Sequence, residues 1–82
     1  MHYTVYIIYS ERYKKFYTGF SSNIEQRLLS HNELGIKGWT IKYRPWRLIH
    51  SEVFESKIEA LKREKFLKSG IGRQWVKSTF FL

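Results

Sequence analysis

The chain begins with an unbroken run of β-branched and aromatic residues. Residues 3–9 read YTVYIIY, and residues of these types are typical of a strand that is buried on both faces. The polar residues 10–14 then predict a turn, and residues 16–20 predict a second strand that ends near Gly19. The start of the chain therefore predicts a β-hairpin.

The remaining segments predict helices around one further strand. Residues 22–25 (SNIE) and 56–59 (SKIE) both match the capping box, in which a serine and a glutamate satisfy free amides where a helix begins. The predicted elements after the hairpin are a helix over about 23–33, a loop over 35–45, a strand over 46–54, a helix to about Lys68 and a short helix over about 72–77. This order, β-β-α-β-α-α, predicts an α+β domain with a three-stranded antiparallel sheet flanked by helices, formed by residues 1–82 as one domain.

Composition narrows the class of protein. Cysteine is absent, which excludes disulfide scaffolds, thiol catalysis and cysteine-based metal sites. No apolar run is long enough to span a membrane, and residues 1–6 lack the basic segment of a secretory signal, so we expect a cytoplasmic protein. The net charge is +8, and residues 42–82 hold ten of the 15 Lys and Arg residues. This excess favours a polyanionic partner, although a basic balance can also simply aid solubility.

Two polar residues of the first predicted helix lie beside its apolar stripe. At about 100° per residue, Arg27 and His31 share a face that borders Ile24 and Leu28. An arginine there could bind a phosphate through two hydrogen bonds, or its side chain could extend past the core into water. His31 could equally be a histidine at the edge of the core with ordinary partners.

The second long helix has a carboxylate within its apolar stripe. Glu64 lies in the stripe that includes Ala60 and Leu67, and the rest of this helix is strongly basic. An ionised carboxylate in such a position must be paired, bind a cation or be protonated. An ion pair with Arg27 or Lys68 and a role as a metal ligand are therefore both open.

The hairpin places two tyrosines on one face of the sheet if its loop has an even number of residues. The simplest such loop, residues 10–13, pairs Tyr9 with Lys14 and Tyr6 with Tyr17. A three-residue loop would place the two rings on opposite faces instead. Because core packing is the commoner role of tyrosines in strands, neither tyrosine alone indicates chemistry.

Taken together, these residues resemble the GIY-YIG nuclease superfamily. Residues 4–6 (TVY) and 17–19 (YTG) are similar to its two half-motifs, and Arg27, His31 and Glu64 match the arginine, histidine and glutamate that follow in the family. The resemblance covers nearly the whole chain, and it is strongest to the small stand-alone bacterial members, which consist of the nuclease domain and little else.

A few positions depart from the family pattern. The first glycine of the motif is Thr4, its two central isoleucines are Val5 and Thr18, and a lysine that some relatives place after the second half-motif is Phe20. Both motif tyrosines, which carry the chemistry in the family, are intact.

The resemblance implies an endonuclease that hydrolyses phosphodiester bonds in nucleic acid, most naturally DNA selected by its structure. The implied catalytic residues are Tyr6, Tyr17, Arg27, His31 and Glu64. Glu64 would hold one Mg²⁺ or Mn²⁺ ion, and Arg27 would bind the phosphate oxygens. Tyr6 is our first choice for the base that activates water, with Tyr17 as the positioning group and His31 orienting Tyr6 or relaying its proton. The roles of the two tyrosines can be exchanged.

The protonation of the tyrosine is the difficult step in this scheme. A free tyrosine has a pKa of about 10, so it is a poor base at neutral pH. We expect the nearby cation and Arg27 to favour its phenolate form.

Basic residues outside the motifs are expected to contact the backbone of the nucleic acid, which gives affinity without reading sequence. They are Lys42, Arg44, Lys57, Lys62, Lys65, Lys68 and Arg73. Because so small a domain is expected to bind weakly, a homodimer or a protein partner is a further expectation, and no membrane partner is expected.

Two other functions are open at this point. The chain could be a catalytically inactive nucleic-acid-binding module of the same fold, or an adaptor that binds proteins through Trp39, Trp46 and the aromatic residues near the end of the sequence. DNA repair is among the roles that the resemblance implies.

Overall fold

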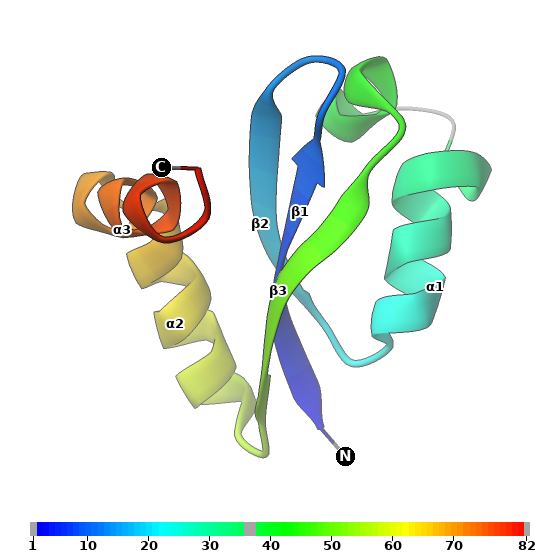
Figure 1. Cartoon of the computed structure of the whole chain (residues 1–82). Coiled ribbons are helices and arrows are strands. Elements are labelled where there is room, and N and C mark those ends of the chain that lie inside the picture. The colour runs from blue at the N-terminus through cyan, green and yellow to red at the C-terminus, as the bar shows by residue number, and fades with distance from the viewer. Residues whose placement is uncertain (1, 36–37, 82) are drawn as a thin grey trace.

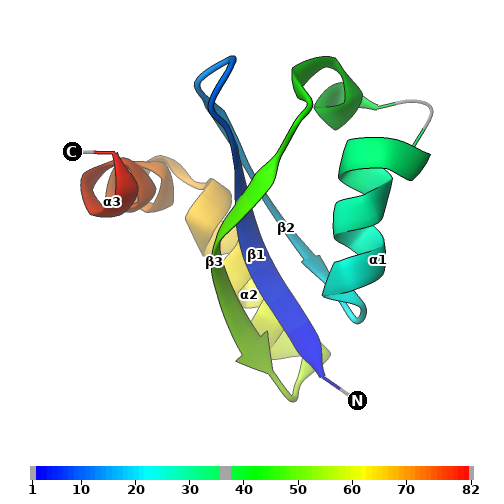
Figure 2. The same ribbon diagram turned by 45° about the vertical axis from the view of Figure 1, so that its right-hand side comes forward.

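A three-stranded antiparallel sheet forms the centre of the fold, with the strand order β2-β1-β3 (Figure 1). The computed structural model describes residues 2–35 and 38–81. Its strands are β1 (Tyr3–Ser10), β2 (Lys15–Ser21) and β3 (Arg47–Phe54), and its α-helices are α1 (Ile24–Leu29), α2 (Lys57–Lys68) and α3 (Gly70–Phe80). Helix α1 covers one face of the sheet, and α2 and α3 lie on the other face (Figure 2). The α+β class and the order β-β-α-β-α-α are confirmed.

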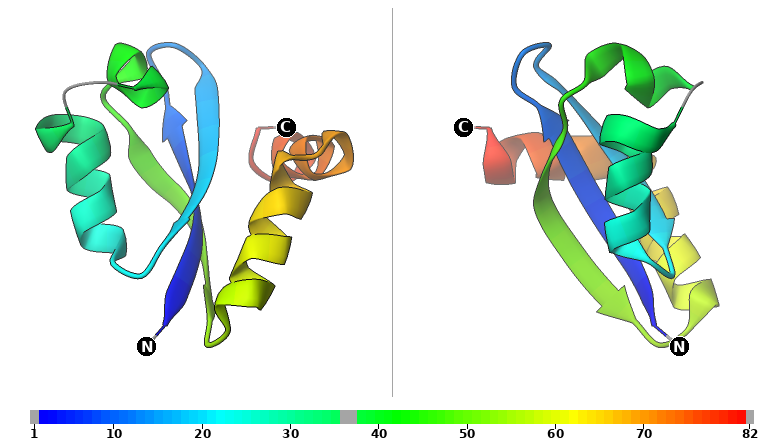
Figure 3. Two further views of the ribbon diagram at one scale, coloured as in Figure 1. Left: turned by 180° about the vertical axis from the view of Figure 1, so that it is seen from behind. Right: turned by 90° about the vertical axis from the view of Figure 1, so that its right-hand side faces the viewer.

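Strand β1 lies between the other two strands, and its central residues are buried on both faces. Val5, Tyr6, Ile7 and Ile8 each expose 1% of their surface or less, as the apolar run predicts. Because successive side chains of a strand point to opposite faces, β1 contributes to two separate cores. Figure 3 shows the helices on either side of the sheet that complete these cores.

The fully buried side chains of the core on the side of α2 and α3 are apolar. Its buried members are Val5, Ile7, Ala60, Leu67 and Val76. Fully burying an aliphatic side chain of the size of valine or leucine stabilises a fold by roughly 1.5–3 kcal/mol. This side of the sheet therefore supplies much of the stability that a short chain needs.

The core on the side of α1 contains aromatic rings that carry polar atoms. Its buried members are Tyr6, Ile8 and Trp46, and the half-buried side chains packed against them are Tyr17, Ile24, Leu28 and Tyr43. Buried hydroxyl and indole groups need hydrogen-bond partners. The polar contacts of the molecule consequently concentrate on this side.

The register of the hairpin differs from the predicted one. The loop comprises residues 11–14, so Tyr6 lies opposite Gly19 instead of Tyr17. Lys14 has a φ of 54°, a left-handed conformation that a strand residue does not adopt, and this residue therefore belongs to the loop. Because the loop still has an even number of residues, Tyr6 and Tyr17 lie on the same face, as expected.

The first helix begins differently from the predicted capping box. Its N-cap is Asn23, whose side chain accepts a hydrogen bond from the Gln26 amide, so the predicted box of Ser22 and Glu25 is wrong. The physical reason is that Ser21 Oγ accepts a hydrogen bond from the Asn23 amide and fixes Asn23 as the cap. After α1 the chain continues as a π-helical turn, η1 (Ser30–Leu34), which ends before Gly35 as predicted.

The segment predicted as a loop over 35–45 contains a further short helix. This 3₁₀ helix, η2 (Trp39–Tyr43), brings its side chains against the α1 side of the sheet. Residues 36 and 37 of the predicted loop lie outside the described part of the chain.

Helices α2 and α3 follow each other almost without a break. Ser56 caps α2 by accepting a hydrogen bond from the Glu59 amide, as the capping box predicts. Ser69 Oγ accepts one from the Gly72 amide, and α3 is therefore longer than the predicted helix over 72–77. A Cβ atom on Gly72 would overlap the backbone of Phe66 and Leu67, so only glycine permits this tight junction. No described helix has the length and apolarity that crossing a membrane requires.

Candidate active site

The two motif tyrosines meet above Gly19. Tyr6 comes from β1 and Tyr17 from β2, and both pack on the α1 side of the sheet. A Cβ atom on Gly19 would lie 2.5 Å from Tyr6 Oη and 3.2 Å from ring carbon Cε2 of Tyr17. The first distance is too short for any real side chain. Glycine is therefore needed at this position because the phenol of Tyr6 crosses over the neighbouring strand.

Tyr6 begins a chain of hydrogen-bonded side chains on this side of the sheet. Its Oη lies 2.8 Å from His31 Nε2, and His31 Nδ1 lies 2.9 Å from Thr40 Oγ1. Tyr6 and His31 expose only 1% and 8% of their surfaces. Three elements far apart in the sequence (β1, η1 and η2) therefore meet in one polar contact. Sequence reasoning gave Thr40 no role, because nothing local indicates that η2 returns to His31.

Arg44 holds the turn that carries His31. Its Nε donates a hydrogen bond to the carbonyl oxygen of His31, and its Nη2 donates to those of Ser30 and Gly35 at 3.0 and 2.8 Å. Carbonyl groups at the end of a helix have no partner within that helix, so an arginine is an effective substitute. Arg44, which the sequence suggested as a nucleic-acid contact, thus uses two of its three nitrogens to hold the turn of His31.

Burial keeps Tyr6 and His31 in their neutral forms. The pKa of Tyr6 is raised above its ordinary value of 10.0, first because burial disfavours the phenolate and then through Tyr17 and, more weakly, Glu64, while Arg27 acts in the opposite direction. The expected lowering by Arg27 is therefore present but outweighed. Burial also lowers the pKa of His31 from 6.5, and the positive charges of Arg27 and Arg44 lower it further.

These two neutral groups form a donor–acceptor pair. With the imidazole proton on Nδ1, His31 donates to Thr40 and leaves Nε2 free to accept the hydroxyl proton of Tyr6. We assign this tautomer because it gives the hydroxyl proton of the buried Tyr6 an acceptor, whereas the other tautomer would make Nε2 a donor. The arrangement can receive a proton from Tyr6 without any change of structure.

Arg27 lies at the rim of this pair. It is exposed on α1, and its charge reaches both Tyr6 and His31. Among residues 2–35 and 38–81 it forms no ion pair with a carboxylate. An exposed guanidinium beside two buried neutral groups can bind an anion without first breaking an internal contact.

Glu64 approaches the tyrosines from α2. Its side chain is 17% exposed, and its Oε2 lies 3.2 Å from Lys68 Nζ, which confirms one of the two predicted ion pairs. The described residues show no ion pair between Glu64 and Arg27. Lys68 Nζ in turn lies 5.5 Å from the centre of the Tyr17 ring. β2 is the edge strand of the sheet, and the charge of Glu64 raises the pKa of Tyr6, so the carboxylate lies within electrostatic reach of Tyr6.

The sequence model of the GIY-YIG catalytic domain matches residues 2–74. The chain belongs to the GIY-YIG family. The matched model describes a catalytic domain, and the family is one of nucleases. Tyr6, Tyr17, Arg27 and Glu64 all lie within the matched range.

The chain is also similar to proteins named UPF0213. It is 42% identical over 53 residues to UPF0213 protein SSP2268 of Staphylococcus saprophyticus, which covers 65% of each chain, less than two thirds of that relative. It is 39% identical over 74 residues to a UPF0213 protein of Limosilactobacillus reuteri, covering 88% of this chain and 76% of the other. The solution NMR structure of UPF0213 protein BH0048 from Bacillus halodurans matches 98% of this chain and 86% of its own, with a TM-score of 0.58 and 26% identity.

The donor set of this GIY-YIG chain suits a hard divalent cation that keeps most of its water. Glu64 offers one carboxylate at the edge of the site, and Mg²⁺ commonly takes one or two carboxylates while water and substrate complete its shell. No three His, Asp or Glu side chains of the described residues cluster as an all-protein metal cage would require. A cation that binds the Glu64 carboxylate would displace the ammonium group of Lys68 from it.

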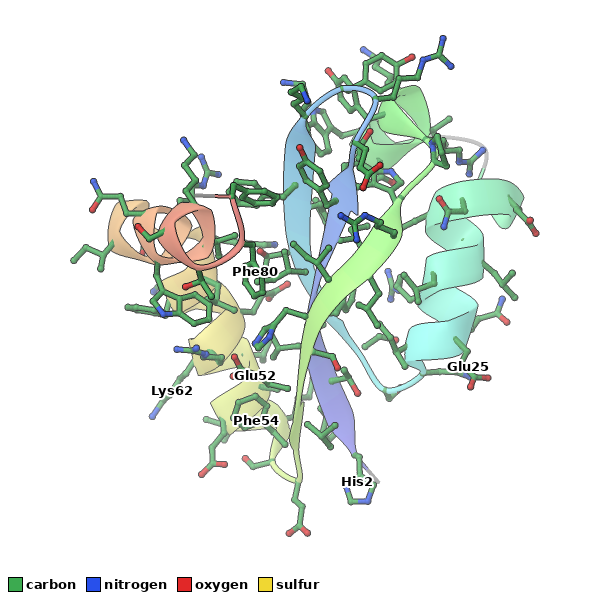
Figure 4. All side chains as sticks on the ribbon, viewed as in Figure 1. His2, Glu25, Glu52, Phe54, Lys62 and Phe80 are labelled. Carbon is green, nitrogen blue, oxygen red and sulfur yellow. The ribbon has the colours of Figure 1, made fainter. Side chains whose placement is uncertain are left out.

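An open groove of about 560 Å³ lies beside Tyr17. The side chains that line it are Lys14, Lys15, Phe16, Tyr17, Thr18, Trp39, Leu67, Lys68, Arg73 and Lys77. Only Lys68 and Arg73 of the predicted nucleic-acid contacts are among them. Lys57 and Lys65 lie elsewhere on the exposed surface of α2, Lys42 belongs to η2, and Figure 4 shows Lys62 directed away from the sheet. The hairpin lysines and Lys77 were missed because their proximity depends on the tertiary fold.

A second polar cluster lies on the side of α2 and α3. Glu52 on β3, labelled in Figure 4, accepts hydrogen bonds from Arg63 Nε and Nη2 at 2.9 and 3.0 Å and lies 2.7 Å from His50 Nε2. Burial alone would raise the pKa of Glu52, but the hydrogen bonds from Arg63 and His50 hold it below its usual 4.5. Each of these groups has a protein partner, so the cluster fastens β3 to α2.

Proposed function

We propose that the protein is a metal-dependent endonuclease that hydrolyses phosphodiester bonds of DNA, selecting its substrate by structure rather than by base sequence. The main support is the meeting of Tyr6 and Tyr17 above Gly19, at the sheet edge that Glu64 approaches from α2. A core has no need of two phenols, an imidazole and a carboxylate that converge from separate elements.

Glu64 is the proposed metal ligand. A Mg²⁺ or Mn²⁺ ion bound there would polarise the phosphate and stabilise the leaving oxygen. Arg27 binds the non-bridging oxygens, where negative charge increases during the reaction. Tyr17, which lies beside both Gly19 and the Glu64–Lys68 pair, positions the phosphate or the attacking water.

Tyr6 is the proposed base, and His31 makes this role possible. Because its pKa is raised, Tyr6 carries a proton at neutral pH and cannot act as a base alone. The raised pKa of Tyr6 and the lowered pKa of His31 both oppose proton transfer between them in the free protein. Arg27 and a cation at Glu64 would favour the phenolate form of Tyr6. The hydroxyl proton would then pass to Nε2 of His31, and the phenolate would take a proton from water as the water attacks phosphorus. Thr40 orients the imidazole for the first transfer.

The proposal is tested with purified protein on branched and linear DNA in Mg²⁺, Mn²⁺ or EDTA. We expect nicking that requires metal, and we expect Glu64→Gln to bind DNA but not to cut it. Glu59→Gln is the matched control, because it removes an exposed carboxylate from the same helix. Nicking in EDTA, or nicking by Glu64→Gln at the wild-type rate, would reject the metal role of Glu64.

The same assay separates the other two functions. Binding without nicking would indicate an inactive nucleic-acid-binding module, and neither binding nor nicking would favour the adaptor. A cytoplasmic location and a role in DNA repair accompany the proposal as predictions from the sequence and from the family resemblance.

A further inference from the structure

The groove beside Tyr17 continues past the hairpin toward α3. A second hollow of about 520 Å³ shares three of its lining residues with the groove, namely Lys14, Phe16 and Lys77. The two hollows therefore adjoin beside the edge strand β2, and we call them together the channel. One end of this channel is at Tyr17 and Trp39, and the other is at Tyr9 and Phe81.

The walls of the channel carry positive charge and no carboxylate. Its basic residues are Lys14, Lys15, Lys68, Arg73 and Lys77, and no Glu is among the lining residues. Within residues 2–35 and 38–81, only Lys68 of these five forms an ion pair. Unpaired cations along a concave surface concentrate positive potential, which attracts a polyanion and follows its backbone.

Trp39 gives the channel an aromatic surface next to the candidate active site. Three rings hold it, with centroids at 4.7 Å for Tyr43, 5.9 Å for Trp46 and 6.1 Å for Tyr17. Nevertheless 46% of its surface is exposed, and it lines the groove. A fixed, exposed indole beside a row of cations is the arrangement on which an unpaired base stacks.

The channel cations and the exposed ring of Trp39 together favour unpaired over paired nucleic acid. Bases inside a duplex are already stacked on one another, and so their faces cannot reach an indole in a groove wall. A single strand can present both its phosphates and the face of a base to the same channel. Cations alone would suit either form, and Trp39 therefore decides in favour of the unpaired one.

We propose that this channel binds a single-stranded segment of nucleic acid, with its phosphates along the channel cations and an unpaired base stacked on Trp39. The inference deepens the proposed function and depends on it only for the fate of the strand, which enters the active site beside Tyr17. It names the substrate class as a strand with unpaired bases at the point of cleavage. The common chemistry is a sugar–phosphate chain, which DNA and RNA both provide.

The test measures binding in EDTA, so that no turnover is needed. Fluorescence anisotropy compares 12-nucleotide strands of oligodeoxyuridylate and oligouridylate, which differ only in the 2′-hydroxyl group, with a blunt 12-base-pair duplex. We expect the wild-type protein to bind at least one single strand about 10-fold more tightly than the duplex, because base–aromatic stacking contributes on this scale. The inference would be overturned if the duplex bound as tightly as the tighter of the two single strands. A preference between the two strands would identify DNA or RNA as the natural source.

Two double variants test where the strand lies. Lys14→Gln/Lys77→Gln removes two channel cations, and Lys57→Gln/Lys62→Gln removes two exposed cations that do not line the channel. Both lower the net charge equally, so only position distinguishes them. We expect the channel variant to reduce affinity about 10-fold and to make the slope of log K against log salt shallower by about 1.4, from two phosphate contacts at roughly 0.7 each. An equal loss in both variants would contradict the proposed path.

Trp39→Leu tests the stacking surface. It retains apolar packing but has no aromatic face, and we expect about 10-fold weaker binding of single strands with little change for the duplex. Trp39→Phe should recover part of the loss, and circular dichroism establishes that each variant is folded. Unchanged binding by folded Trp39→Leu would remove Trp39 from the proposal.

These results are separable from those for the proposed function. Binding of single strands without metal-dependent nicking would sustain the channel and remove the nuclease. Nicking by a protein whose channel variants bind normally would sustain the nuclease and remove the channel.

Discussion

The two faces of the sheet share strand β1 but use it in opposite ways. On the side of α2 and α3, Val5 and Ile7 pack against aliphatic side chains and have no polar partners to satisfy. On the side of α1, the intervening residue Tyr6 carries a hydroxyl group into the core and must find His31. Val5 and Ile7 thus serve packing, whereas Tyr6 between them is available for chemistry.

This difference indicates how a short chain can hold a polar site without losing its fold. A buried polar group costs free energy unless it is hydrogen-bonded, so a polar core contributes less net stability than an apolar one. Confining the polar chain of Tyr6, His31 and Thr40 to one face leaves the other face free for close apolar packing. Changes to the polar chain on the α1 side should therefore affect activity, and changes to the apolar core on the opposite side should affect stability.

The largest expected effect comes from the tyrosine hydroxyl on the α1 side. Tyr6→Phe removes the proposed base, and we expect single-turnover cleavage to fall about 10²–10⁴-fold while DNA binding persists. Tyr3→Phe is the matched control, because Tyr3 lies on the same strand but packs against the apolar core on the opposite side. Equal cleavage by the two variants would show that the chemistry does not depend on the α1 side of β1.

The next effect concerns the apolar core. Leu67→Ala should lower the free energy of unfolding by about 2–5 kcal/mol, because Leu67 is fully buried and its removal leaves a cavity. Leu61→Ala in the same helix should cost much less, since Leu61 is 39% exposed. Chemical denaturation followed by circular dichroism measures both. Similar losses would show that the α2 side is not the main source of stability.

A smaller effect is expected from a methyl group between the tyrosines. Gly19→Ala places a Cβ where Tyr6 Oη and the Tyr17 ring now lie, and overpacking of this kind costs about 1–3 kcal/mol. We also expect cleavage to fall, by less than in Tyr6→Phe, because the phenol of Tyr6 must move but is retained. Gly70→Ala meets nothing within 4 Å and serves as the control. A folded Gly19→Ala protein with full activity would refute the proposed geometry.

The smallest effect is a pH dependence of stability. Because the folded-state pKa of His31 lies below 6.5, the unfolded chain takes up a proton first as the pH falls, and stability should decline from about pH 6.5 downward. Glu52, whose folded-state pKa lies below 4.5, contributes a separate loss only at more acidic pH. Denaturation between pH 7.5 and 5 should therefore show a decline that His31→Gln reduces and His2→Gln does not. A decline of the same size in both variants would exclude His31 as its cause.

Much of the fold follows from local sequence, because the signals are local. The apolar run of β1 and the cap at Ser56 each act over a few residues, and both predictions are confirmed. The hairpin register was wrong because it depends on the backbone conformation of one residue, Lys14. The cap of α1 was wrong for a similar reason, since the side chain of Ser21 decides between two adjacent candidates.

The candidate site was predictable only in part. The parity of the loop placed Tyr6 and Tyr17 on one face, and the position of Glu64 in an apolar stripe marked it as unusual. By contrast, Thr40 and the channel lysines acquire their roles from contacts between elements that are distant in sequence. Charge counted along the sequence favoured α2, whereas the channel takes its cations from the hairpin, α2 and α3.

The most direct test of the central claim is a titration of the protein with Mn²⁺, followed by paramagnetic broadening in NMR spectra. If Glu64 is the metal ligand, the resonances of Glu64 and of the Tyr17–Gly19 segment should broaden most in the wild-type protein. In Glu64→Gln, the Tyr17–Gly19 segment should broaden no more than the rest of the chain. The carboxylate of Glu52, which lies beside His50, is already occupied by Arg63 and should broaden less. Broadening centred on Glu52, or a pattern that Glu64→Gln leaves unchanged, would contradict the proposed site.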